Sequence, residues 1–117
     1  MRRELYDAMN REEILSALLC TIDETGLWML ATLRVANKPV AKNYLREITN
    51  KRYIETKMQP EEKILIPSRY ILDITIAKLE GAALIKVERV GQTRLYQLTA
   101  LGNEIIKFRE IMRNGVN

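Results

Sequence analysis

The chain has 117 residues, a formal net charge of +4, one cysteine and no histidine. The missing histidine excludes serine–histidine and cysteine–histidine catalysis, and one cysteine can form neither an internal disulfide nor a structural zinc site. The length predicts a single domain over residues 1–117, and the basic charge suits a surface that binds a polyanion.

Motifs for enzymatic chemistry are also missing from the sequence. It has no Gly-x-Gly-x-x-Gly, no Walker-type loop and no Asp-rich loop for a divalent cation. We therefore expect no enzymatic activity, no cofactor and no metal.

The sequence predicts a cytoplasmic location. Met1–Arg3 is basic, but Glu4 and Asp7 follow where a secretion signal would be apolar. The longest apolar stretch, LWMLATL, is too short to span a membrane. Cys20 lies in the apolar ILSALLC, where we expect a buried thiol in a reducing compartment.

Two helices are predicted before residue 37. Asn10 and Glu13 have the spacing of a capping box, and Gly26 is expected to terminate the helix that follows. The apolar LWMLATLRVA predicts a second helix, since Leu and Met outnumber β-branched residues; a strand is the lesser alternative. The apolar face of the first helix would consist of Ile14, Leu15, Leu18 and Leu19.

A third helix is predicted from Asn37, which can cap it, with Pro39 tolerated in the first turn. Its basic residues recur every four positions, so they would share one outer face. These residues are Lys38, Lys42 and Arg46. The inward residues would be Val40, Ala41, Leu45 and Ile48.

The segment of residues 50–66 has the weakest pattern. KRYIETKM and KILI flank Gln59–Glu62, which allows either a hairpin or an irregular excursion. Ser68 is then a good N-cap for a helix over RYILDITIAKLEGAAL. The inward stripe of that helix would be Leu72, Ile76 and Leu79.

A two-stranded hairpin and a closing helix complete the predicted elements. LIKVERV and RLYQLT read as strands joined by a turn at Gly91–Gln92. Thr99 is expected to cap the last helix. Its apolar residues, at spacings of four, three and four, are Leu101, Ile105, Phe108 and Met112.

This order of elements resembles the winged helix-turn-helix arrangement over residues 27–108. The most specific part is LEGAALIKVERVGQTRLYQLTALG, which matches the family pattern at Leu79–Glu80, Leu84–Ile85 and Tyr96-x-Leu98-Thr99-x-x-Gly102. Ala83 stands where Gly is usual, so we expect a turn there without a left-handed residue. The resemblance implies an α+β, mostly α fold with a two-stranded wing and a C-terminal helix.

The wing is the first candidate DNA-binding surface. A narrow tip that carries Arg89 and Arg94 can lay positive charge along a phosphate backbone or into a minor groove. Lys86, Gln92 and Thr93 would add secondary contacts. The alternative is a solvated hairpin whose arginines only maintain solubility, and we favour DNA contact.

The start of the Ser68 helix is the second candidate surface. Its free N–H groups and its positive dipole end suit a phosphate, and Arg69 and Tyr70 project from the first turn. Simple capping by Ser68 is compatible with this role. The basic residues Lys38, Lys42 and Arg46 either grip the backbone beside the groove or form a solvated face.

The Ser68 helix has an apolar face wider than one buried stripe requires. Ile71 and Ile74 lie off the inward stripe, where base-reading side chains of a recognition helix normally project. We favour burial of this face against a second subunit, with Ile71, Ile74 and Lys78 in the interface. The alternative is that residues 50–66 fold over both isoleucines within one chain.

A narrower resemblance follows from the apolar recognition helix, the RVG wing and YQLTALGNEI. These features are similar to the TubR family, the centromere-binding adaptors of tubulin-type plasmid partition systems. The resemblance implies a dimer that buries its recognition helix, inserts the helix N-termini into the major groove and places its wings in the minor grooves. It also implies coating of DNA repeats, recruitment of a tubulin-like GTPase and repression of the protein's own operon.

On that resemblance the DNA contacts fall on Ser68, Arg69 and Tyr70 at the helix start and on Arg89 and Arg94 in the wing. Residues 50–66 depart from the pattern, because they exceed a normal helix-turn-helix connection. Two other functions stay open: a dimeric repressor acting on a single operator, and a winged-helix module for protein–protein assembly.

Overall fold

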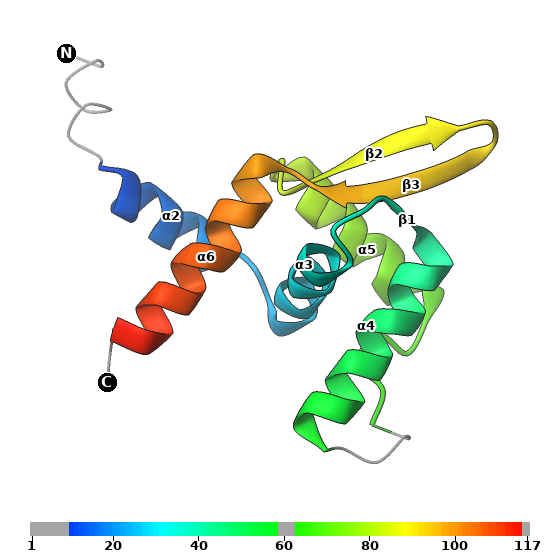
Figure 1. Cartoon of the computed structure of the whole chain (residues 1–117), viewed down its shortest axis with the longest axis horizontal. Coiled ribbons are helices and arrows are strands. Elements are labelled where there is room, and N and C mark those ends of the chain that lie inside the picture. Colours follow the sequence, from blue (N-terminus) through cyan, green and yellow to red (C-terminus); the bar gives the residue numbers. More distant parts are fainter. Residues whose placement is uncertain (1–9, 59–62, 116–117) are drawn as a thin grey trace.

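The computed structural model describes residues 10–58 and 63–115 and confirms the winged helix-turn-helix fold (Figure 1). The elements in chain order are α2 (Arg11–Leu19), α3 (Glu24–Ala36), β1 (Val40–Ala41), α4 (Lys42–Lys57), α5 (Arg69–Gly81), β2 (Ile85–Val90), β3 (Thr93–Leu98) and α6 (Ala100–Gly115). The three strands form one antiparallel sheet in the order β1-β3-β2. The basic start Met1–Arg3 and the predicted turn at Gln59–Glu62 lie outside the described residues.

Helix α3 is the centre of the core, with α4, α5 and α6 packed around it (Figure 1). Its apolar sequence explains this position, because Met29, Leu30 and Leu33 are all buried. The prediction of a helix over residues 27–36 is confirmed, and the alternative of a strand is wrong. Each neighbouring element buries its own apolar residues against α3, among them Leu45, Leu72, Ile76, Tyr96, Ile105 and Phe108.

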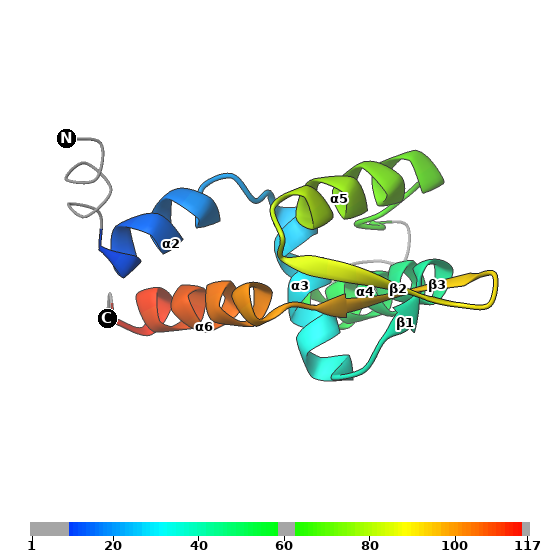
Figure 2. The same ribbon diagram turned by 90° about the horizontal axis from the view of Figure 1, so that it is seen from above.

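Helices α2 and α6 lie side by side and extend away from the wing (Figure 2). The predicted N-cap of α2 is confirmed, since Asn10 Oδ1 accepts a hydrogen bond from Glu13 N at 2.8 Å. Arg11 forms an ion pair with Glu104 on α6. The apolar faces of both helices are only partly covered. Leu15 is buried and Leu18 and Leu19 are half-buried, but Ile14 and Met112 are exposed.

Two predictions about the end of α2 are wrong. Gly26 does not terminate a helix: it lies in the first turn of α3, where its N–H donates to Oδ1 of the N-cap Asp23. A glycine fits there because a Cβ would come within 2.9 Å of Ile22 Cγ2. Cys20 is exposed and not buried, because α2 ends at Leu19 before the thiol can face the core.

The predicted third helix begins later than expected. Asn37 is the left-handed C-cap of α3, with φ 51°, and does not cap the next helix. Pro39 precedes β1, in which Val40 pairs with Tyr96 and Ala41 with Leu95. Helix α4 therefore starts at Lys42, and Lys38 is not on it.

Helix α4 continues to Lys57, so a hairpin from KRYIETKM is wrong. Helix α5 starts at Arg69, which leaves residues 58–68 as the connection between the two helices. Ile66 in this connection is fully buried, and Leu65 packs against the core. The end of this connection nearest α5 is therefore anchored to the domain by the side chains of Leu65 and Ile66.

The turn between α5 and β2 is left-handed at Ala83, with φ 62°, contrary to expectation. Leu84 N donates to Leu79 O and Ala83 N donates to Glu80 O, the two hydrogen bonds of a Schellman motif. The motif requires a positive φ at this position, so the alanine adopts the conformation that glycine would adopt more easily.

Within the described residues no single helix is long and apolar enough to cross a membrane. Helices α2 and α3 reach that apolar length only together, and they are bent by 116° relative to each other.

Candidate nucleic-acid interface

The wing is a regular hairpin that extends beyond the helices (Figures 1 and 2). The predicted turn is confirmed, with Gly91 at φ 65°. At the base of the hairpin Ile85 and Tyr96 are buried, and they fix it to the core. All residues from Lys86 to Arg94 are exposed.

Arg89 and Arg94 are paired directly across the two strands near the tip. They lie on the same face of the hairpin as Val87 and Tyr96, because side chains alternate between the faces of a strand. The single acidic side chain of the wing, Glu88, lies on the opposite face with its partner Leu95. Like charges in directly opposite positions destabilise a hairpin, so this arrangement favours an anionic ligand.

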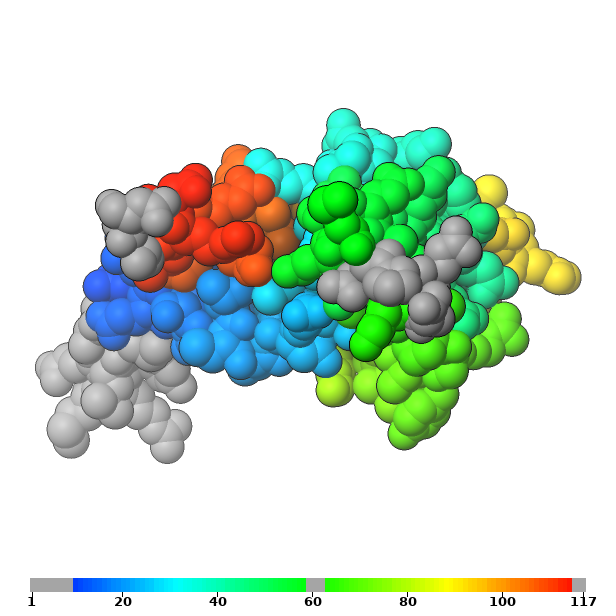
Figure 3. All heavy atoms as spheres, turned by 90° about the horizontal axis from the view of Figure 1, so that it is seen from below, coloured from blue at the N-terminus to red at the C-terminus, as the bar shows by residue number. Residues whose placement is uncertain are grey.

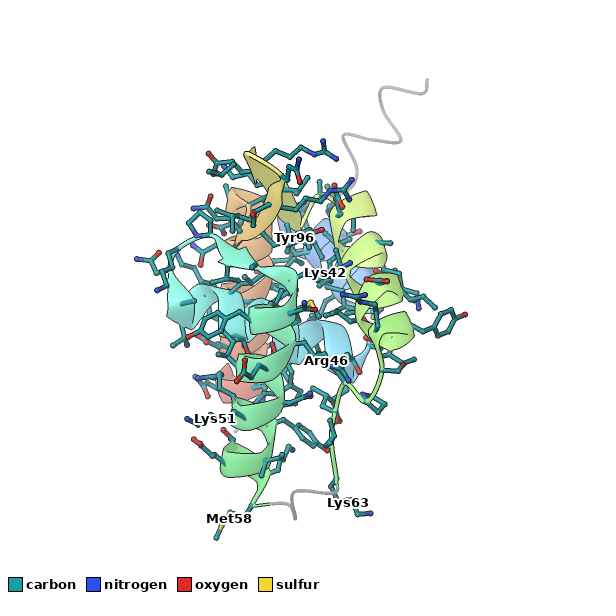
Figure 4. The ribbon with its side chains drawn as sticks, turned by 90° about the vertical axis from the view of Figure 1, so that its right-hand side faces the viewer. Lys42, Arg46, Lys51, Met58, Lys63 and Tyr96 are labelled. Carbon is teal, nitrogen blue, oxygen red and sulfur yellow. The ribbon has the colours of Figure 1, made fainter. Side chains whose placement is uncertain are left out.

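The N-terminus of α5 is capped by Ser68, as predicted: Ser68 Oγ accepts a hydrogen bond from Ile71 N at 3.2 Å. Arg69 and Tyr70 are exposed in the first turn, and 70% of the Tyr70 surface is accessible. Figure 4 views the side of the molecule on which the wing and the starts of α4 and α5 lie. The structure therefore brings the two candidate surfaces to one side.

The outward face of α5 is acidic beyond its first turn. Tyr70, Asp73, Ala77 and Glu80 are all exposed, and their spacing of three, four and three places them on one face. Two carboxylates along this face would repel the phosphates of a helix lying lengthwise in the major groove. On this face, the N-terminal end of α5 with Arg69 is the part best suited to approach DNA.

A pair of polar side chains from α4 holds the chain just before Ser68. Asn50 Oδ1 accepts from Ile66 N at 2.7 Å, and Asn50 Nδ2 donates to Ile66 O at 3.1 Å. Arg46 Nε donates to Ile66 O at 3.2 Å, and its Nη2 donates to Pro67 O at 2.9 Å. The role of Asn50 was not predicted, because a single amide within a helix leaves no pattern in the sequence.

Lys38, Lys42 and Arg46, predicted to lie on one outer face of a helix, do not lie on a common face. Lys42 and Arg46 lie on α4 and point between α4 and α5 (Figure 4), where Lys42 Nζ is 2.8 Å from Asp73 Oδ1. Lys38 is exposed before β1, on the other side of Pro39. The difference arises because the chain from Asn37 to Ala41 is a turn and a strand, and not the helix that the spacing suggested.

Ile71 and Ile74 are both half-buried on α5. Ile71 packs against the core, beside the buried stripe of Leu72, Ile76 and Leu79. Ile74 lies further from that stripe, and Lys78 one turn on is exposed.

Within residues 10–58 and 63–115 no group of three His, Cys, Asp or Glu side chains is placed to hold a metal ion.

A helical core, a basic two-stranded wing and a capped helix start on the same side define a winged helix-turn-helix protein of the kind that binds nucleic acid. No protein-family model matches the chain. It is 38% identical over 103 residues to the DNA-binding protein TubR of Bacillus cereus (strain ATCC 10987 / NRS 248), over 86% of each of the two chains. The chain therefore belongs to the TubR family, which confirms the resemblance found in its sequence.

Proposed function

We propose that this protein is a sequence-specific double-stranded DNA-binding protein of plasmid partition. In this proposal a homodimer coats short DNA repeats in the cytoplasm, links them to a tubulin-like GTPase and represses its own operon. The similarity to a DNA-binding protein of the same family supports the DNA-binding part. No step of this function requires catalysis.

The observation that carries the proposal is the cross-strand pair of Arg89 and Arg94. Two exposed guanidinium groups in register cost the free hairpin stability, and a phosphate placed between them would remove that cost. Gln92 and Thr93 at the tip can donate hydrogen bonds to the same backbone, and Lys86 adds charge nearer the base.

The second surface is the N-terminal end of α5, where Ser68, Arg69 and Tyr70 would contact the DNA. Free N–H groups and the helix dipole favour a phosphate at this end, whereas Asp73 and Glu80 disfavour contact along the rest of the helix. Lys38 and Lys42 are proposed backbone contacts beside it, although Lys42 would first have to leave Asp73. For Arg46 its two bonds to carbonyls support a positioning role instead.

The dimer in this proposal forms through the side of α5 that carries Ile71, Ile74 and Lys78. Ile74 supports this choice, since it is half-buried and lies outside the fully buried stripe of the helix. A partner helix packed on it would remove apolar surface from water and leave the N-terminal ends free. The partner GTPase has no surface assigned to it.

The proposal is tested by selecting fragments of random DNA and of the source replicon, followed by an anisotropy titration of the selected fragment at two salt concentrations. We expect a cluster of short repeats, filled cooperatively, with affinity that falls steeply as salt rises. A single palindromic site would assign the protein as an ordinary dimeric repressor. Enrichment of no fragment would contradict DNA binding and leave an assembly module.

A further inference from the structure

A groove of about 390 Å³ lies between α3, the end of α4 and the C-terminal half of α6. Its floor is one face of α3, formed by Leu27, Trp28 and Ala31, all half-buried. Figure 3 shows the face of the molecule on which α4 (green) and α6 (red) are both visible, with α6 on the side away from the wing. No function proposed above uses this surface.

The groove combines an apolar floor with a cationic rim. Lys57 from α4 and Arg109 and Arg113 from α6 line it, against the one carboxylate of Glu24. The ion pairs within residues 10–58 and 63–115 are Arg11–Glu104, Arg34–Glu110 and Lys42–Asp73, so the rim cations take part in none of them. Three cations beside one anion favour a negatively charged ligand.

An aromatic contact supports Trp28 in the floor. The ring of Trp28 meets the ring of Tyr53 edge to face, with centroids 5.4 Å apart and an interplanar angle of 86°. This contact fixes the indole of Trp28 from the α4 side. A preformed flat apolar surface binds an aromatic or aliphatic body at little entropic cost.

We propose that this groove is a binding site for a small apolar carboxylate. The body of the ligand would lie on Leu27, Trp28 and Ala31, and its carboxylate would pair with Arg109, Arg113 and Lys57. The volume falls within the range of small-molecule sites, about 300–1,000 Å³. The lining residues of α3 run from Glu24 to Ala31, about 10 Å of helix, which suits a small ligand better than an extended acidic peptide.

The test uses Trp28 as the reporter, because it is the only tryptophan in the chain. The intact protein is titrated with 4-phenylbutyrate, its neutral amide and the corresponding amine, which share one apolar body. We expect a saturable change in Trp28 fluorescence with the carboxylate, at a Kd below about 1 mM, with binding of the amide about tenfold weaker and none of the amine. Equal responses to all three, or no saturable response up to about 10 mM, would overturn the proposal.

Two variants separate the site from the fold. Lys57→Gln/Arg113→Gln changes exposed side chains only and should weaken carboxylate binding about tenfold while leaving amide binding unchanged. The matched control, Lys51→Gln/Lys107→Gln, removes two exposed cations of the same two helices outside the groove and should leave both affinities unchanged. If the double rim variant bound the carboxylate like the parent, or if only an acidic peptide bound the groove, the small-carboxylate assignment would be wrong. None of these outcomes depends on DNA binding.

Discussion

Asn50 on α4 completes both backbone hydrogen bonds of Ile66, sixteen residues further along the chain, as a neighbouring strand would. The Ile66 side chain is fully buried, so the amide of Asn50 satisfies polar groups that water cannot reach freely. Ile66 is two residues from Ser68, the N-cap of α5. The position of the proposed DNA-contacting helix start therefore depends on an amide side chain in another helix.

Asn50→Ala should lower the free energy of unfolding by about 1–3 kcal/mol, because it leaves Ile66 N without a partner. Urea denaturation followed by circular dichroism measures this change. Asn43→Ala is the matched control, since Asn43 is exposed on the same helix and should change stability by less than about 0.5 kcal/mol. Equal effects of the two substitutions would show that the Asn50 bonds contribute nothing to stability.

Arg46 should affect DNA affinity without contacting phosphate. Arg46→Ala removes the bonds to Ile66 O and Pro67 O, so we expect weaker binding but an unchanged slope of log K against log salt. Arg94→Ala should also weaken binding, but with a slope reduced by about 1. Anisotropy titrations across a salt series give both slopes. A reduced slope for Arg46→Ala would make Arg46 a phosphate contact.

The parts of this structure that the sequence predicted correctly depend on local signals. The hairpin is specified by β-rich segments around Gly91, and the caps at Asn10, Ser68 and Thr99 each bond to residues within three positions. Because wing and caps are local, the sequence placed them to within a residue or two. The two candidate surfaces follow directly from these elements.

Two of the errors concern features that depend on distant residues. Strand β1 has only two residues and exists because Val40 pairs with Tyr96, which no periodicity near Val40 reveals. Without that strand, the spacing of Lys38, Lys42 and Arg46 suggested a continuous helix. The reading of residues 50–66 left a hairpin or an irregular excursion open and missed the end of α4, since Tyr53 and Ile54 are typical of strands.

Gly102 was recognised only as part of a pattern, and its physical role is a close approach between elements. A Cβ at this position would lie 2.1 Å from Leu84 O and 2.8 Å from Leu98 Cδ1. Gly102→Ala should therefore destabilise the fold by about 3 kcal/mol or more, because backbone must move. Gly81→Ala, with nothing within 4 Å of the new methyl group, should instead stabilise it by about 0.4–1 kcal/mol. Thermal melts of both variants should shift in opposite directions; a parallel shift would contradict this role of Gly102.

The proposed dimer places Ile74 of one copy near Ile74 of the other. In a Cys20→Ser background, which removes the exposed native thiol, Ile74→Cys should form a covalent dimer with a short bis-maleimide. Lys51→Cys, on the exposed side of α4, is the control and should remain uncrosslinked. Denaturing gels measure the product, and sedimentation gives the mass of the parent. A monomer at micromolar concentration would refute the dimer.

Ala83 offers a gain in stability, because it occupies a left-handed position at φ 62° that costs an L-residue about 1 kcal/mol. The Schellman bonds from Ala83 N and Leu84 N, and the hydrogen bond that Ala83 O accepts from Thr99 Oγ1 at 2.6 Å, hold the chain in this conformation. Ala83→Gly should therefore raise the free energy of unfolding by about 1 kcal/mol, despite the greater freedom of glycine in the unfolded chain. The reciprocal variant Gly91→Ala, at φ 65° with open space around it, should lower it by about the same amount. Urea denaturation of both tests the argument, and a destabilised Ala83→Gly would show that the turn is not strained by its methyl group.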